Sequence, residues 1–286
     1  MKGWKEEMSP DSLTEIGNSL IQHGNLNSRI YIMKMGEDDP SNLISETEKL
    51  ASENGYGKIF GKIPEVKAGY FRDAGYTEEA FVPEFFRGRE NAVFLSRFLS
   101  DERKISKTWE KEDEILRKCL ERRSKKRENK ALPEGLTVKV AGEEDILSLC
   151  RHFAAVFETY PFPVDDPDFI RKSIDEGTVY LIVKRGDEII AASSAEADYD
   201  YKNAEMTDFA VSPAARGMGI AGYLLREMEK IMKERGIILF YTIARSLEAP
   251  MNYTFAGAGY SYAGRLLNNT NICGSFESMN VWYKKI

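Results

Sequence analysis

The hydrophobic pattern is clearest in the second half of the chain, where short apolar runs alternate with segments of helical periodicity. Short apolar or alternating runs predict strands, and apolar residues three and four positions apart predict helices. The predicted strands are 136–140, 178–184, 188–195, 204–211, 237–243, 260–267 and 279–284, and the predicted helices are 143–157 and segments ending near 176, 236 and 259. This order predicts a mixed α/β domain.

The first half of the chain shows the same kind of pattern less strongly. It predicts strands at 29–33, 57–61 and 79–86 and helices at 43–54 and 66–74, which also indicates an α/β domain. The passage Phe71-Arg-Asp-Ala-Gly-Tyr76 is echoed by Phe255-Ala-Gly-Ala-Gly-Tyr260. Both coincidence and descent from a degenerate half-copy of the second domain stay open.

A charged segment separates the two halves. Residues 101–130 are rich in charge and lack glycine, and Pro133 and Gly135 follow. We expect a solvated helix at about 101–130 and then a boundary, with domains at 1–132 and 133–286. The basic cluster from Arg122 to Arg127 is interpreted as a solvated face without a function.

The composition excludes several classes of protein. With 42% hydrophobic and 30% charged residues the chain should fold, and 40 basic against 46 acidic side chains disfavour a nucleic-acid partner. The three cysteines are far apart and not grouped with histidine, so neither a disulfide framework nor a metal site is expected. Apolar runs are too short to span a bilayer and none lies near the start. We expect a cytoplasmic protein with no membrane partner.

The segment from Val211 to Gly222 lies between a predicted strand and a predicted helix. A diphosphate needs several N–H donors directed at one point. The first turn of a helix provides unpaired N–H groups and a positive dipole end, and glycines let the backbone approach. In the following helix Ile220, Leu224, Met228 and Ile231 recur at helical spacing, so one face packs on a sheet. The pattern predicts a phosphate-binding loop, although a structural turn also uses glycine.

In its details this loop resembles the acetyl-CoA loop of the GNAT superfamily, Arg/Gln-x-x-Gly-x-Gly/Ala, through Arg216-x-x-Gly219-x-Ala221. The resemblance implies a mixed, mostly antiparallel twisted sheet flanked by helices, with acetyl-CoA as cosubstrate and no metal. It also implies a pyrophosphate held by backbone N–H groups and a pantetheine arm paired with the preceding strand. The cofactor-binding residues would be Arg216, Gly217, Met218, Gly219, Ile220 and Ala221 in the loop and Phe209, Ala210 and Val211 in the strand.

Acetyl transfer to an ammonium requires a base that removes a proton. In many GNAT enzymes a glutamate lies on the strand that enters the loop, and Glu205 matches that position. Strand alternation predicts Glu205, Thr207, Phe209 and Val211 on one face and Asp208 on the other. The alternative for Glu205 is an ordinary surface ion pair.

The general acid is less clear. Many relatives carry a tyrosine four residues before the Gly-Phe/Tyr after the last helix, and Phe255 occupies that position here. Tyr253 or Tyr260 could protonate the thiolate instead, although core packing is the favoured role for each. A water molecule or the pantetheine environment is the other source of this proton. Asn252 is a candidate for hydrogen bonds to the pantetheine amides.

Two segments are candidates for binding the acceptor amine. The first is Tyr160-Pro-Phe-Pro163, with Tyr160 and Phe162, although such a run also stiffens a loop. The second is the tail, where asparagines crowd a predicted sheet that normally disfavours them. Its candidates for binding a carboxylate or an ammonium are Arg265, Asn268, Asn269, Asn271 and Glu277.

These segments, together with Gly57-Lys-Ile-Phe-Gly-Lys-Ile-Pro64 and Glu277-Ser-Met-Asn-Val-Trp-Tyr283, resemble the β-lysine N6-acetyltransferases over nearly the full length. The resemblance implies transfer of acetyl to the terminal amine of β-lysine within a ternary complex. The product, Nε-acetyl-β-lysine, is a compatible solute of salt-stressed methanogenic archaea.

Two alternatives remain from the sequence. One is a GNAT enzyme for another small amine, such as lysine, ornithine or a polyamine. The other is a non-catalytic acetyl-CoA sensor, which the replacement of tyrosine by Phe255 suggests. The N-terminal domain has three open roles: shaping the acceptor pocket, forming a homodimer or sensing a ligand.

Overall fold

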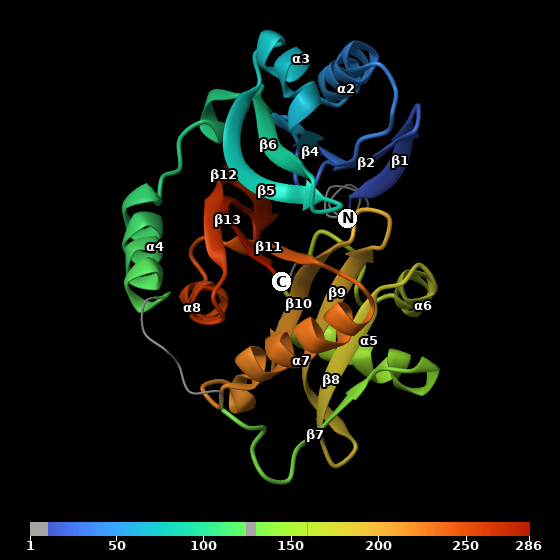
Figure 1. Cartoon of the computed structure of the whole chain (residues 1–286), viewed down its shortest axis with the longest axis vertical. Helices are drawn as coiled ribbons and strands as arrows, with labels where there is room; N and C mark the ends of the chain where they lie inside the picture. Colours follow the sequence, from blue (N-terminus) through green and yellow to red (C-terminus); the bar gives the residue numbers. More distant parts are fainter. Residues whose placement is uncertain (1–10, 124–129, 159) are drawn as a thin grey trace, which may run out of the picture. The chain divides into compact units, whose positions relative to one another are not determined.

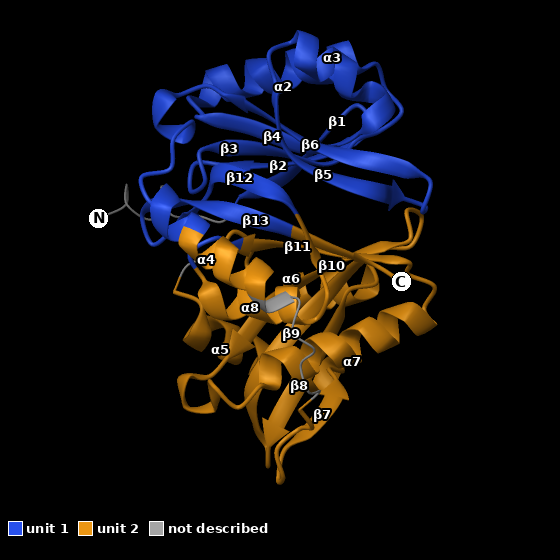
Figure 2. Cartoon of the chain, turned by 60° about the vertical axis from the view of Figure 1, so that its left-hand side comes forward, with its two compact units in different colours: residues 1–113, 245–247, 263–281 blue, residues 114–244, 248–262, 282–286 orange. Residues whose placement is uncertain are grey.

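The computed structural model describes residues 11–123, 130–158 and 160–286, so most of the basic cluster lies outside the described residues. The chain forms two compact units, coloured separately in Figure 2. The first contains residues up to Asp113 with Arg245–Leu247 and Ala263–Val281, and the second contains Glu114–Ala244, Glu248–Tyr262 and Trp282–Ile286. This division differs from the expected boundary near residue 133, because C-terminal residues complete the first unit and the charged helix belongs mostly to the second.

The first unit is an α/β structure (Figure 1). Its strand order is β1-β2-β3-β4-β6-β5-β12-β13. The elements are β1 (Ser12–Ile16), β2 (Ser19–Gly24), β3 (Arg29–Lys34), α2 (Pro40–Asn54), β4 (Lys58–Pro64), η1 (Glu65–Lys67), α3 (Ala68–Asp73), β5 (Thr77–Phe86), β6 (Glu90–Phe98), η2 (Asp101–Arg103) and most of β12 (Ser261–Ile272) and β13 (Ser275–Lys285). The strands and helices predicted from 29 to 86 are confirmed, and β1, β2 and β6 were not predicted.

One face of this sheet is apolar and packs against α2 and α3. Alternate residues of β3 and β4 supply it, because successive side chains in a strand point to opposite faces. The core side chains include Ile30, Ile32, Leu43, Ile59, Ile63, Phe71, Val93 and Leu95.

The opposite face carries buried charge. Lys58 and Glu79 are almost completely buried, and their side chains join at 2.7 Å. The Lys58 ammonium also donates to the carbonyl of Leu267 at 2.8 Å, and the other Glu79 oxygen accepts the Leu267 N–H at 2.6 Å. Strands β12 and β5 share the single register pair Gly264 and Ala80. At Leu267 the ion pair therefore supplies the hydrogen bonds that a paired strand would supply on that side of β12.

The second unit is built around the strand order β11-β10-β9-β8-β7. Strand β10 is antiparallel to β9 and parallel to β11. The elements are α4 (Trp109–Arg123), β7 (Thr137–Val140), η3 (Glu143–Asp145), α5 (Ile146–Val156), α6 (Pro167–Asp175), β8 (Val179–Arg185), β9 (Glu188–Asp198), β10 (Asn203–Val211), η4 (Pro213–Ala215), α7 (Ile220–Glu234), β11 (Leu239–Arg245) and α8 (Ala249–Gly257). Every strand and helix predicted after residue 133 is confirmed, whereas the helix expected over about 101–130 spans only Trp109–Arg123 among the described residues.

Two apolar cores cover the two faces of the second sheet. Helices α7 and α8 pack on one face, and α5 and α6 pack on the other. The first core includes Met206, Leu224, Met228 and Phe255, and the second includes Leu149, Phe153, Ile170 and Ala210. Among the described residues, no helix is both long and apolar enough to cross a membrane.

The contact between β5 and β12 depends on Gly264, which gives the first prediction. A Cβ at Gly264 would lie against the Glu79 carbonyl oxygen and 2.6 Å from the Ala80 Cα, at a φ of +152°. We expect Gly264→Ala to lower the free energy of unfolding by about 3 kcal/mol, from overpacking and backbone strain together. Gly274 also has a positive φ, and no atom lies within 4 Å of the point where its Cβ would stand. Gly274→Ala should therefore cost only about 1 kcal/mol in urea unfolding, and equal losses would refute the steric argument.

The buried ammonium of Lys58 predicts a pH dependence of stability. Burial lowers the pKa of Lys58 to about 8 from 10.5, and the neighbouring Glu79 offsets this only in part. Between these two values the unfolded chain binds more protons than the folded one, so the free energy of unfolding rises with pH. We expect wild type to gain stability relative to Lys58→Met/Glu79→Gln between about pH 7 and about pH 9.5, measured by urea unfolding. A constant difference would contradict the lowered pKa.

Candidate active site

The central feature of the second unit is a divergence between two parallel strands. Strand β10 pairs with β11 only from Asn203 to Glu205, although both strands continue. On the other side, the register with β9 shifts between Thr207 and Ala210, so Asp208 and Phe209 together oppose one residue. This is a β-bulge, which bends a strand and ends its pairing. Among the described residues, no strand pairs with β10 on its β11 side from Met206 to Val211.

The bulge reverses which side chains of β10 face which core. Before it, Ala204 and Met206 lie in the core under α7, and after it Phe209 and Val211 pack there while Ala210 joins the core under α5. The prediction that Glu205, Thr207, Phe209 and Val211 share one face is wrong. Simple alternation assumes one residue per pleat, and the extra residue of the bulge shifts the pattern by one.

Asp208 lies in the bulge with an unusual environment. Its φ is +53° and its side chain is buried. The carboxylate accepts hydrogen bonds from the Ser194 hydroxyl of β9 at 2.6 Å and from the Tyr160 hydroxyl of the loop between α5 and α6. Burial raises the pKa of Asp208, which these hydrogen bonds lower in part. Strand alternation predicts Asp208 on the face opposite Glu205, so its hydrogen bonds to Ser194 and Tyr160 were not predicted.

The predicted phosphate loop has the geometry that an anion requires. Gly217 and Gly219 have φ of +80° and +81°, and Gly219 begins α7 without a side-chain cap. Among residues 11–123, 130–158 and 160–286, none accepts a hydrogen bond from the six backbone N–H groups between Gly217 and Gly222. These donors lie at the positive end of the α7 dipole. The residues present therefore fit a diphosphate.

Positive side chains surround this loop. Arg216 is exposed, and its Nε donates to the Val211 carbonyl at 3.4 Å. The guanidinium of Arg226 donates to the carbonyls of Gly222, at 2.9 Å, and of Lys130. The Lys130 side chain lies beside Gly219, with its Cδ 3.3 Å from where a Cβ would stand. The cations favour an anionic ligand at the loop.

Glu205 is half-buried at the last residue where β10 and β11 pair. Glu196 of β9 lies directly opposite it on one side and Tyr241 of β11 on the other. Two like charges directly opposite in a sheet are unfavourable. This placement, at the start of the strand divergence, keeps Glu205 as a prediction for the base.

Helix α8 contains Asn252, Tyr253 and Phe255, and Tyr260 follows the helix. Tyr253 is half-buried at the core under α7, while Tyr260 and Phe255 are completely buried, with their rings 5.2 Å apart. The Asn252 side chain is fully buried, and its contact with the cofactor stays a prediction. Its amide donates to the Glu248 carbonyl and its oxygen accepts the Trp282 indole N–H, both at 2.9 Å.

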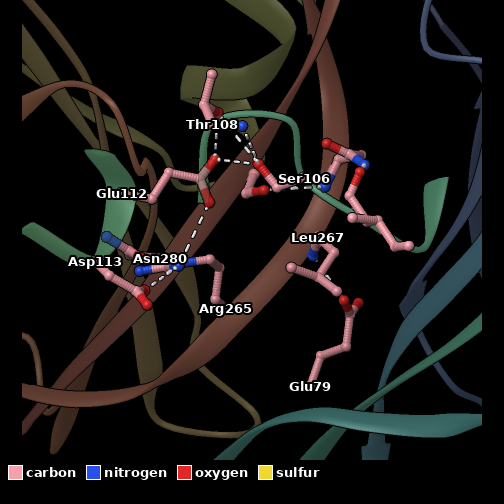
Figure 3. A network of polar contacts seen from close by, with 11 residues as sticks. Glu79, Ser106, Thr108, Glu112, Asp113, Arg265, Leu267 and Asn280 are labelled. Carbon is pink, nitrogen blue, oxygen red and sulfur yellow. Dashed lines mark hydrogen bonds and ion pairs between the residues drawn. The ribbon is translucent and has the colours of Figure 1, made fainter. Parts of the chain in front are cut away.

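Arg265 takes part in a polar network of the first unit, shown in Figure 3. Its Nη1 contacts Asp113 at 2.7 Å and Glu112 at 3.4 Å, and its Nε donates to Asn280 at 3.1 Å. Glu112 is completely buried and also accepts hydrogen bonds from Ser106 and Thr108. Two protein carboxylates thus engage Arg265 within the first unit, and its role in binding a substrate carboxylate stays a prediction.

The other tail candidates are also engaged in the first unit. The Asn268 amide donates to the carbonyls of Glu102 and Ile105, and the Asn271 amide donates to that of Leu26, all within 3.0 Å. Asn269 is buried, and its main-chain carbonyl accepts from Arg29 at 2.7 Å. Glu277 forms a two-pronged ion pair with Arg245. These side chains satisfy main-chain carbonyls or balance charge within the protein, and binding of substrate by Asn268, Asn271 and Glu277 stays a prediction.

The two candidates in the loop after α5 lie in the second unit. The Phe162 ring is 6.2 Å from that of Phe169 and packs on the core under α5. The Tyr160 ring stacks on Phe157 at 4.5 Å, and its hydroxyl joins Asp208 of the bulge. Only Tyr160 is thus connected to the strand that carries Glu205.

Comparison with known proteins agrees with this geometry. Residues 146–250 match the model of the acetyltransferase (GNAT) family. The chain is 41% identical to a beta-lysine N(6)-acetyltransferase of Methanococcus maripaludis, over 96% of this chain and 98% of the relative. It is 30% identical to the enzyme of that name from Methanosarcina mazei, over 83% and 94%, and 29% identical to the N-acetyltransferase YodP of Bacillus subtilis, over 94% and 96%. This chain therefore belongs to the beta-lysine N(6)-acetyltransferase family within the GNAT acetyltransferases.

Proposed function

We propose that this chain transfers the acetyl group of acetyl-CoA to the terminal N6 amine of β-lysine, within a ternary complex. The observation that carries the donor side is the row of six free N–H groups between Gly217 and Gly222 beside the unpaired edge of β10. The GNAT family uses acetyl-CoA. The names of the relatives from Methanococcus and Methanosarcina support the acceptor.

In this proposal the loop binds the pyrophosphate of the cofactor and the edge of β10 binds its pantetheine arm. The N–H groups of Gly217 to Ala221 and the Arg216 side chain hold the pyrophosphate, which places the negative charge at the start of α7. The backbone of Phe209, Ala210 and Val211 pairs with the amides of the pantetheine arm, as a third strand would. The acetyl group then lies where β10 and β11 diverge.

Glu205 is the proposed base of the reaction. It accepts a proton from the acceptor ammonium, and the neutral amine forms a bond to the acetyl carbonyl carbon while the bond from that carbon to sulfur breaks. The departing thiolate takes a proton from Tyr253 on α8, the proposed donor. The newly acylated nitrogen gives up its second proton, which restores the Tyr253 hydroxyl. Glu205 is the last residue of β10 that pairs with β11, so in this proposal it borders the site of the acetyl group. The product would accumulate in the cytoplasm as a compatible solute.

The acceptor is tested by release of free thiol from acetyl-CoA. We expect purified protein to release thiol with β-lysine at a kcat/KM at least about tenfold above that with α-lysine, ornithine or spermidine. An equal or faster reaction with another of these amines would replace β-lysine as the substrate. Binding of acetyl-CoA without thiol release in any of the four reactions would instead indicate a sensor.

The donor site is tested by two glycines at opposite ends of the same helix. Gly217 precedes α7 and Gly236 follows it, each has a positive φ, and no atom lies within 4 Å of a Cβ built at either. Gly217→Ala and Gly236→Ala should therefore lower the melting temperature by similar amounts. We expect only Gly217→Ala to raise the KM for acetyl-CoA, by about tenfold, because its methyl group would obstruct the phosphates. Similar KM values in the two variants would remove the loop from the donor site.

The base is tested by the pH dependence of Glu205→Gln. Below the pKa of the acceptor amine the substrate is an ammonium, so we expect kcat/KM to fall by about a hundredfold. The deficit should narrow as the pH approaches that pKa, because free amine then needs no base. Glu196→Gln removes a charge from the opposite position and should not reproduce this pH dependence. A deficit of Glu205→Gln that stays constant across pH would exclude it as the base.

A further inference from the structure

We propose that Asp208 is a positioning residue, which holds the Tyr160 side chain against the acidic face of β9 and β10 where the acceptor ammonium binds. The inference rests on the proposed function and names residues that shape the acceptor side of that site. It begins from the fact that Asp208 joins three segments that are separate in sequence: the bulge of β10, the strand β9 and the loop between α5 and α6.

The backbone at Asp208 requires a restricted set of residues. A φ of +53° is unfavourable for most side chains and is tolerated best by glycine, asparagine and aspartate. Glycine would satisfy the backbone without placing a charge in the interior. The carboxylate is therefore explained by what it contacts, namely the hydroxyls of Ser194 and Tyr160.

This carboxylate is costly for the folded state. It is 5% exposed, and no lysine, arginine or histidine of the described chain forms an ion pair with it. Burial raises the pKa of Asp208 and also that of Tyr160. A buried charge without a cation and with a left-handed backbone is poor for stability, and such combinations persist where function needs them.

The surroundings of the Tyr160 ring indicate that it lines the binding site of the acceptor ammonium. Glu205 and Glu196 lie directly opposite each other on β10 and β9, three and twelve positions before Asp208 in the chain. Tyr160 reaches this part of β10 through its hydroxyl, which donates to Asp208. Two carboxylates opposite each other make this face acidic, and an aromatic ring beside a bound cation adds a favourable cation–π contact. An ammonium of the acceptor has this chemistry.

The bulge also separates the acceptor from the donor. Phe209 and Val211 turn toward the α7 core, where the phosphate loop begins, whereas Ala210 joins the core under α5. The His152 ring of α5 lies 3.1 Å from the Ala210 carbonyl and donates to it through Nε2. Side chains from the α5 side thus fix the bulge at two points, Asp208 and Ala210. The acetyl group and the amine would approach β10 from its two sides.

The test compares two tyrosines of the same core. Tyr160→Phe removes the hydroxyl bonded to Asp208, whereas Tyr180→Phe removes a hydroxyl that instead lies 2.9 Å from Ser173. We expect Tyr160→Phe to raise the KM for the acceptor by about tenfold, the loss of one hydrogen bond to a charged group, and to leave the KM for acetyl-CoA within about twofold. Tyr180→Phe should change neither constant. Asp208→Asn keeps the backbone preference and should reproduce the effect of Tyr160→Phe.

The double variant decides whether the two residues act together. Because the hydroxyl acts through Asp208, Tyr160→Phe/Asp208→Asn should raise the acceptor KM no more than the larger single change. Additive increases, an effect confined to the acetyl-CoA KM, or an equal effect of Tyr180→Phe would each overturn the inference. If Tyr160→Phe does not fold, the same split in KM is measured on Asp208→Asn alone. Turnover by the wild type with β-lysine tests the proposed function separately, since the inference can fail while that turnover persists.

Discussion

The bulge in β10 is the constraint on which the candidate site depends. One extra residue bends β10, and among the described residues β11 pairs with it only as far as Glu205, which leaves a strand edge beside the loop for a ligand. The same residue moves Phe209 to the α7 core and turns Asp208 toward Tyr160. Without it, β10 and β11 would pair along their length, and the phosphate loop would stand beside a closed sheet.

Buried charge has a different role in the first unit. There the Lys58 and Glu79 side chains bind the main chain at Leu267 where a neighbouring strand would otherwise do so. An ion pair inside a protein loses hydration on both sides, and an apolar pair of similar volume often costs less. The ion pair is directional, because an ammonium bonds only to a main-chain carbonyl and a carboxylate only to a main-chain N–H. The pair therefore favours one position of Leu267 on β12, which an apolar contact would not specify.

Features that depend on a few neighbouring residues could be predicted from the sequence, and features that depend on distant strand pairing could not. The loop from Arg216 to Ala221 and the helix after it were predictable, because N–H donors, glycines and apolar spacing are all set within a few residues. The role of Asp208 was not predictable, because the bulge depends on the pairing of β10 with β9 and cannot be seen in the alternation of apolar and polar residues. The tail asparagines were noticed as exceptions, but Asn268 and Asn271 serve carbonyls more than a hundred residues away in sequence. An exception of this kind indicates a polar interaction without revealing whether its partner is a ligand or the protein itself.

The interleaving of the two units has a consequence for how the chain is made. Residues up to Asp113 begin the first unit, but Ala263–Val281 complete it only after most of the second unit has been passed. During synthesis the first unit therefore emerges early and lacks β12, the main-chain partner of Lys58 and Glu79, until well over a hundred further residues have followed. Domains usually fold in the order in which they leave the ribosome. In this protein the first unit cannot be completed until nearly all of the second unit has been synthesised. Until then, the sheet face that carries Lys58 and Glu79 stays exposed to water.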